Sequence, residues 1–176
     1  MFRNRTELLI QQGYFLVFSL RDSDSVLMKP TTIERIHTLA IDPVQQNGLS
    51  PLKGLFATEE WWSNIDAGVI ESYFFSGFIV GFNKEDRILD GKTVVLIKRD
   101  DNNYNDGVEI SFTNEKIKMI YSDLYQQGNH IFISYIIQET NNKDNWGGIV
   151  KRSGVSCILN KIYIKPLQEG ISQITQ

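Results

Sequence analysis

The chain has 176 residues, of which 41% are hydrophobic and 22% charged, a composition that excludes an intrinsically disordered protein. This length predicts a single globular domain spanning residues 1–176. The formal net charge of −3 argues against nucleic acid as a partner, because nucleic-acid-binding domains usually carry a basic face.

The N-terminal segment predicts a helix followed by a strand. Residues 5–13 read RTELLIQQG, in which Gly13 occupies the position where helices commonly stop. Residues 14–20, YFLVFSL, are rich in aromatic and branched side chains, which is typical of a buried strand. A turn at RDSDS then leads to VLM, residues 26–28, which we expect to be the returning strand.

A second helix and a long connection follow this first strand. Residues 30–40, PTTIERIHTLA, predict the helix, and either Thr31 or Thr32 is expected to be its N-cap. Residues 42–54 hold two prolines and two glycines and are expected to form an irregular loop.

Residues 58–68, TEEWWSNIDAG, place two tryptophans in succession within a predicted helix. Thr58 can cap this helix, and the two glutamates after it suit the positive end of the helix dipole. Trp61 and Ile65 share one face, which we expect to be buried. Trp62 points roughly 100° away and borders that face. Either both rings cover a strand surface, or Trp62 stays partly exposed among the acids.

The rest of the chain is rich in strand patterns, some of which alternate apolar and polar residues as half-buried antiparallel strands do. The expected strands are residues 69–82, 92–98, 107–112, 129–138, 147–152 and 155–165. Residues 114–128 fit helical and strand spacing equally, but their length and Gly128 favour a helix. The whole pattern predicts an α+β fold, mainly an antiparallel β-sheet meander packed with a few short helices.

The sequence contains no recognisable catalytic or metal-binding motif, so we expect no metal and no cofactor. Cys157, the single cysteine, is expected to be a small buried side chain. Residues 99–107, RDDNNYNDG, imitate the start of a calcium loop at Asp101, but the later ligand positions do not fit, which favours a hairpin connection. The alternative to a binding protein is a small enzyme with a dispersed active site involving His37 or His130.

The chain resembles the bacterial immunity proteins that neutralise toxins delivered between cells, including those of contact-dependent growth inhibition systems. The resemblance covers residues 58–140 and rests on EEWWSNIDAGVIESYFFSGFIVGF, an acidic, Trp-bearing helix followed by an aromatic strand. It implies an antitoxin that is no enzyme: a stoichiometric inhibitor that binds a basic, nuclease-type toxin domain and blocks its active site. Short apolar runs indicate neither a signal peptide nor a membrane span, so we expect a cytoplasmic protein. The oligomeric state stays open.

Partner binding is expected at carboxylates and aromatic rings that lie close together in the sequence, because rings supply contact area and acids steer a basic partner. The first expected region consists of Glu59, Glu60, Trp62 and Asp66. The second consists of Asp100, Asp101, Tyr104 and Asp106.

Overall fold

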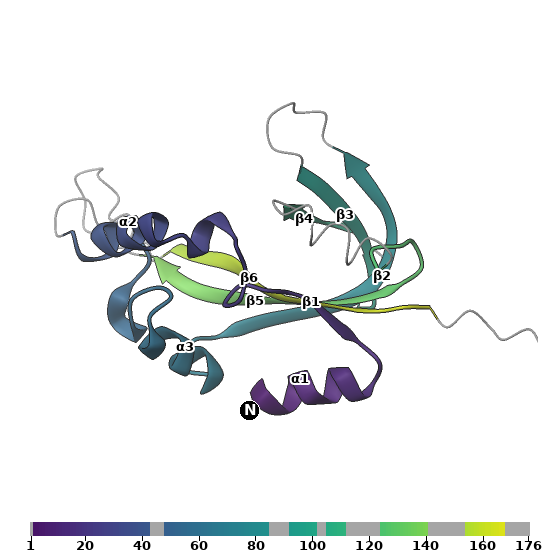
Figure 1. Cartoon of the computed structure of the whole chain (residues 1–176), viewed down its shortest axis with the longest axis horizontal. Helices are drawn as coiled ribbons and strands as arrows, with labels where there is room; N and C mark the ends of the chain where they lie inside the picture. Colours follow the sequence, from purple (N-terminus) through teal and green to yellow (C-terminus); the bar gives the residue numbers. More distant parts are fainter. Residues whose placement is uncertain are drawn as a thin grey trace, which may run out of the picture.

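One antiparallel sheet organises the computed structural model of the chain (Figure 1). The structure describes residues 2–42, 48–84, 92–101, 105–111, 124–140 and 154–167. Within this part of the chain the strands are β1 (Phe15–Ser19), β2 (Ser72–Lys84), β3 (Lys92–Arg99), β4 (Asn105–Ser111), β5 (His130–Thr140) and β6 (Gly154–Lys165). The helices are α1 (Phe2–Gln11), α2 (Pro30–Ile41) and α3 (Glu59–Asp66), with short 3-10 helices η1 (Val26–Met28) and η2 (Pro51–Lys53). The α+β prediction is confirmed.

The six strands lie in the order β1-β6-β5-β2-β3-β4, and every neighbouring pair is antiparallel. Strands β2, β3 and β4 follow one another as a meander, whereas β5 returns to the other side of β2 and β6 continues outward from there. The N-terminal strand β1 then pairs with β6, so that residues near the two ends of the described chain lie side by side. The pairing of β1 with β6 brings the preceding helix, α1, onto the sheet.

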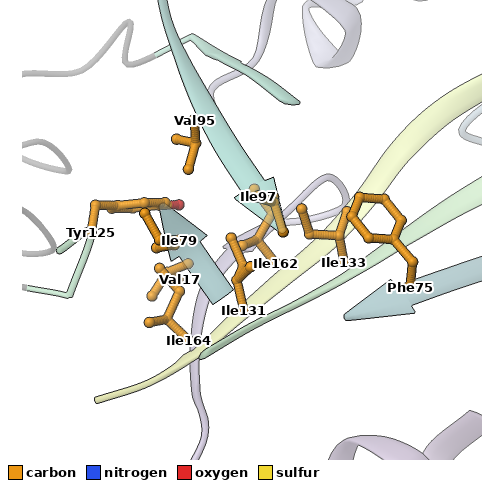
Figure 2. Close-up of a cluster of buried hydrophobic side chains, with 10 residues drawn as sticks. All are labelled: Val17, Phe75, Ile79, Val95, Ile97, Tyr125, Ile131, Ile133, Ile162 and Ile164. Carbon is orange, nitrogen blue, oxygen red and sulfur yellow. The ribbon is translucent and has the colours of Figure 1, made fainter. Parts of the chain in front are cut away.

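Strand β5 shows that the sheet has a different hydrophobic core on each face. Side chains alternate along a strand, so Ile131 and Ile133 point to one face while Ser134, Ile136 and Gln138 point to the other. Figure 2 shows the core on the first face, where side chains from β1, β2, β3 and β6 surround Ile131 and Ile133 of β5, and Tyr125 closes one side. The second face, which we call the helix face, carries α1 and α3, both below the sheet in Figure 1.

Helix α1 ends as its sequence predicts. Gly13 adopts a φ of 86°, and its amide donates to the Ile10 carbonyl while the Tyr14 amide donates to the Leu9 carbonyl. These bonds satisfy carbonyls that the helix itself leaves open. The sharp reversal lets α1 fold back over the helix face, where the Thr6 hydroxyl lies 2.8 Å from the Tyr163 hydroxyl.

Two local predictions in the segment before α3 are wrong. Residues 26–28 form η1 rather than a strand, because the Ser25 hydroxyl accepts a hydrogen bond from the Leu27 amide and starts a 3-10 turn. The N-cap of α2 is Lys29 rather than a threonine, because Pro30 occupies the first helical position with its φ already set for a helix. Part of the expected 42–54 loop is helical, since η2 lies within it.

Cys157 is exposed, so its predicted burial is wrong. It is paired with Ile137 on β5, one position away from the pair of Ile136 and Ile158 that packs against the helix-face core. Ile158 is partly buried against the helix-face core, which places its neighbour Cys157 on the opposite face. The predicted helix at 114–128 lies almost wholly outside the described residues, and the predicted strand at 147–152 lies wholly outside them.

We expect Gly77→Ala to lower the free energy of unfolding by at least about 2 kcal/mol, because overfilled sites force backbone shifts. A Cβ at Gly77 would overlap the Lys98 carbonyl oxygen and lie 2.8 Å from Cγ2 of Ile97. Gly81→Ala is the matched control on the same strand, since its Cβ would meet Leu96 Cδ1 at an ordinary 3.8 Å. Urea unfolding measures both; equal stabilities of the two variants would contradict the close approach of β2 and β3.

Candidate functional site

The helix that carries the two tryptophans begins as its sequence predicts. The Thr58 side chain caps α3 by accepting a hydrogen bond from the Trp61 amide at 3.3 Å. Glu59 and Glu60 occupy the first turn, where their negative carboxylates interact favourably with the positive end of the helix dipole. At the other end Gly68 takes a φ of 76° and donates its amide to the Ile65 carbonyl. Local chemistry thus fixes both ends of this short helix.

Both tryptophans are buried, with exposed fractions of 0% for Trp61 and 6% for Trp62. Their ring centroids lie 4.7 Å apart in an edge-to-face arrangement, and the Phe56 ring lies 4.8 Å from that of Trp61. Of the two alternatives for this pair, burial of both rings is confirmed and a partly exposed Trp62 is wrong. The guanidinium of Arg21 lies 5.4 Å from the Trp62 ring and covers the side that the helix leaves open. Trp62 can serve a binding surface only by supporting it from below.

A buried hydrogen-bond chain fastens α3 to the sheet. Trp61 Nε1 donates to Gln138 Oε1 at 2.9 Å, and Gln138 Nε2 donates to the Ser50 carbonyl oxygen at 2.9 Å. Gln138 lies on β5 and is buried, so both ends of its amide are satisfied by the protein itself. These hydrogen bonds consequently hold the helix at a fixed distance from β5.

The carboxylates of the first expected region lie on the outer side of α3. Glu59, Glu60 and Asp66 are all exposed. Arg21 lies within 3.0 Å of a Glu59 oxygen and 3.9 Å of an Asp66 oxygen. Exposed ion pairs of this kind contribute roughly 0–1 kcal/mol, so a partner can replace them at little cost. The first region is thus a set of three exposed carboxylates, two of which share one arginine.

The second expected region is only partly described. Asp100 and Asp101 are exposed and follow directly after β3. Asp101 pairs with Arg99, whose hydrogen bond holds the pKa of the Asp101 carboxyl below its ordinary value. Tyr104 lies outside the described residues, and Asp106 is described only by its backbone within β4.

Asp100 belongs to a hydrogen-bonded chain that includes one of the two histidines. His130 Nε2 lies 2.9 Å from Asp100 Oδ2, and His130 Nδ1 lies 2.7 Å from the Tyr14 hydroxyl. Asp100 also accepts a hydrogen bond from Ser76. Burial and then the negative charge of Asp100 raise the pKa of Tyr14 above its ordinary value. Both ring nitrogens of His130 have partners in this structure, so the ring joins β5 to the residue before β1 and to the residue after β3.

His37 lies in a separate place. Its Nε2 is 2.8 Å from the carbonyl oxygen of Phe56, so it joins α2 to the segment before α3. The alternative was an active site around a histidine. His130 does lie beside an acid, Asp100, and both nitrogens of its ring have hydrogen-bond partners. Within the described ranges, no group of three or more His, Cys, Asp or Glu side chains is arranged to hold a metal ion.

The two acidic regions lie on the same face of the sheet. His130, which binds Asp100, and Ser134 both point to the helix face and stand four residues apart on β5, a spacing of roughly 13 Å. Between them, Arg5 of α1 lies over the rings of Phe74 and Phe132 at 4.2 and 5.4 Å. Helix α1 therefore separates the Asp100 region from the α3 surface.

A small pocket opens between α1, α3 and the sheet, with a volume of about 100 Å³. Helix α1 contributes Arg5, helix α3 contributes Trp62 and Asp66, and strand β6 contributes Asn160 and Lys161. Apart from Trp62 and Asp66, sequence reasoning did not single out these residues. They come from three distant parts of the chain, and no local pattern marks them as neighbours.

Residues 15–157 match a protein-family model described as Immunity protein RhsI2. The match extends from β1 into β6 and so includes α3, the central strands and Asp100. The fold and the match together define an immunity protein, the class that the sequence resemblance implied. The chain belongs to the RhsI2 immunity protein family. A search of curated proteins found no match, and none of the helices in the described ranges is long and apolar enough to cross a membrane.

We expect Trp62→Ala to lower the free energy of unfolding by about 3–5 kcal/mol, because it removes a buried aromatic ring and leaves a cavity beside Ile65. Glu60→Ala is the control on the same helix, and we expect it to change stability by less than about 0.5 kcal/mol because Glu60 is exposed. Chemical unfolding measures both values. A loss below about 1 kcal/mol for Trp62→Ala would contradict its place in the core.

We expect Asp100→Asn to lower the pKa of Tyr14, because a nearby negative charge disfavours the phenolate and its removal relieves that effect. The pKa should stay above the ordinary value, since burial, the larger cause, remains. Asp101→Asn is the control and should leave Tyr14 unchanged, because Asp101 pairs with Arg99. NMR titration of ring-labelled tyrosine measures the pKa; an equal shift in both variants would refute this assignment.

Proposed function

We propose that this protein binds a cognate toxin domain in a one-to-one complex and blocks the toxin's active site, with the α3 surface as the main contact. The family match supports toxin neutralisation as the biological role. The observation that carries the choice of surface is the anchoring of α3: its exposed carboxylates stand on a helix whose two tryptophans and Ile65 are buried beneath them.

Anchoring matters because binding requires the ordering of any group that is mobile in the free protein. Each side chain or loop that must become fixed on binding lowers the affinity, so a surface fixed in advance binds more tightly. The hydrogen bonds from Trp61 to Gln138 and from Gln138 to the Ser50 carbonyl fix the backbone of α3 before any partner arrives. Only the outer ends of Glu59, Glu60 and Asp66 remain to be ordered.

The charge of this surface favours a basic partner. A nuclease-type toxin binds the phosphates of its substrate with basic side chains, and carboxylates on α3 would occupy those side chains in place of phosphates. Complementary charge also raises the rate of association, which suits an inhibitor that must act before its toxin does. The toxin would reach the cell from a neighbour by direct contact and be neutralised in the cytoplasm.

Asp100 and Asp101 form a second contact in this proposal, together with Tyr104 and Asp106. Asp100 lies beyond α1 on the same face as α3, so one extended partner can cover both acidic regions. The inhibitor acts by occupying the toxin and carries out no reaction of its own. In this proposal the contacts of His130 with Tyr14 and Asp100 hold these segments together and serve no reaction.

The direct test is to purify this chain with the toxin domain whose gene accompanies its own. Native mass spectrometry should give a complex of one copy of each protein, and the toxin's activity should fall to zero at equimolar inhibitor. A toxin that stays fully active in the presence of excess inhibitor would refute the proposal. A complex in which the active site remains accessible to substrate would refute the blocking mechanism.

We expect Glu60→Lys to weaken toxin binding by roughly tenfold or more, equivalent to 1.4 kcal/mol, with most of the change in the association rate. Glu60 is preferred to Glu59 for this test, because Glu59 pairs with Arg21 and its replacement would disturb that arginine as well. Glu34→Lys is the matched control, because Glu34 is an exposed glutamate on α2, away from this surface.

Calorimetry and stopped-flow mixing at low and high salt measure the effect of these variants. Salt should weaken binding of the native protein more than binding of the Glu60→Lys variant, because the variant has lost one attractive charge. Equal affinities for Glu60→Lys and Glu34→Lys would place the interface elsewhere on the molecule.

A further inference from the structure

The pocket between α1 and α3 has a floor made of a single row of residues across the sheet. Ser19 of β1 is paired with Lys161 of β6, Lys161 with Ser134 of β5, and Ser134 with Phe74 of β2. Residues in register point to the same face of a sheet, so these side chains lie in one line on the helix face. All four line the pocket.

A β-bulge adds Asn160 to this floor. The pairing of β5 with β6 shifts between Ser134 and Tyr135, which are paired with Lys161 and Leu159, so Asn160 is the extra residue. Bulges change the direction of a side chain and are common beside functional sites. Here the bulge leaves Asn160 at 6% exposure with its side chain among the residues that line the pocket.

Several hydrogen-bond donors in the pocket have no acceptor among the described residues. The side-chain amide of Asn160 makes no hydrogen bond there, although its backbone carbonyl accepts one from the Leu20 amide. Ser134 Oγ accepts from the Lys161 amide, which leaves its own proton to donate. The Lys161 ammonium has no carboxylate within ion-pair distance in the described part of the chain, and Arg5 contacts only aromatic rings there. These donors line the pocket, so an acceptor bound there can take the hydrogen bonds that the protein leaves open.

The two acids that line the pocket do not supply the missing acceptors. Asp22 accepts a hydrogen bond from Ser19 Oγ at 2.8 Å, and Asp66 lies 3.9 Å from Arg21. Both are exposed, whereas Asn160 and Ser134 are buried. The floor and the α1 side of the pocket therefore present two positive charges and two neutral donor groups with no acceptor of their own.

We propose that this pocket is a carboxylate-binding site and that its occupant is the side chain of an acidic residue of the toxin. The carboxylate oxygens would accept hydrogen bonds from Asn160, Ser134 and Lys161, with Arg5 close by. A volume of about 100 Å³ holds several water molecules, and hence a carboxyl group with a methylene stem. The occupant rests on the proposed function, whereas the carboxylate site rests on the geometry of this chain alone.

The position of the pocket explains why a partner would reach it. Trp62 and Asp66 of α3 form one wall, so a protein lying on the α3 surface covers the mouth of the pocket. The contact would then combine two charge signs: carboxylates of this chain against basic residues of the toxin, and one toxin carboxylate inside a basic hollow. Such an arrangement fixes the orientation of the partner as well as its affinity.

The site is tested first on the isolated protein, with propionate as a mimic of an acidic side chain and propionamide as its neutral control. NMR should show a saturable shift of the Asn160 side-chain amide with propionate and none with propionamide. Lys161→Met should weaken propionate binding about tenfold, as expected for the loss of a charged partner. Lys165→Met, four residues along the same strand and outside the pocket, should leave it unchanged. Correct folding of each variant is read from the same spectra.

Three results would overturn the carboxylate site: no shift at Asn160 with propionate, equal shifts with propionamide, or saturable binding of inorganic phosphate without binding of propionate. The occupant is tested by combining Lys161→Met with replacement of each toxin Asp and Glu by its amide. One toxin acid should lose its effect on affinity in the Lys161→Met background, with a coupling of at least about fivefold. Additive effects for every acid would overturn the occupant. If no toxin complex forms, the occupant falls with the proposed function, while the NMR result still decides the site.

Discussion

The buried amide of Gln138 is the contact on which the helix face depends. It receives the indole proton of Trp61 and donates to the Ser50 carbonyl, so one side chain of β5 joins α3, the sheet and the segment before η2. Loss of this amide would leave a buried N–H and a buried carbonyl without partners, at a cost of about 1–3 kcal/mol each. The aromatic rings around Trp61 bury apolar surface, but the hydrogen bonds fix one orientation of the helix. That orientation sets the positions of the carboxylates on α3.

The sheet contributes more than a support, because its irregularities decide which side chains reach the helix face. Register shifts occur in the pairing of β1 with β6, of β5 with β6 and of β2 with β3. The shift at Asn160 separates two parts of β6: Ile162 and Ile164 belong to the core of the first face, whereas Ile158 packs against the helix-face core. A regular strand with the same residues would send all three to one face. The bulge therefore allows one strand to contribute to both cores and adds a polar residue to the pocket on the helix face.

Local sequence signals were sufficient for α1 and α3, because caps and glycine stops act within a few residues. Thr58 and Gly68 fix α3 whatever lies beneath it, and Gly13 does the same for α1. Local signals left two alternatives for the exposure of Trp62, because Arg21, which lies over its ring, comes from the turn after β1. Two adjacent positions of an eight-residue helix can both be buried when other segments pack around them, while the acidic side of the helix stays exposed.

The same limit applies to contacts made across the sheet. Asp100 and His130 meet because β3 and β5 both pair with β2, and nothing in the two local sequences indicates that order. The bulge at Asn160 exists only as a mismatch between two strands, so it has no signature within β6 itself. Cys157 was assigned to the core from its apolar neighbours, but burial in a strand follows the alternation of faces rather than the mean hydropathy of the segment.

Charge alone is a poor basis for recognition, because an acidic surface attracts many basic proteins. Discrimination requires an element that a wrong partner cannot satisfy. The α3 surface has such an element beside it, since a partner that covers the pocket without placing an acceptor inside it would bury Lys161 and the Asn160 amide without compensation. An unpaired buried charge costs more than a correct surface ion pair contributes. The exposed acids would raise the rate of association, and the pocket would lower the affinity for a partner that brings no acceptor. The affinity and the specificity of such an inhibitor could then change independently.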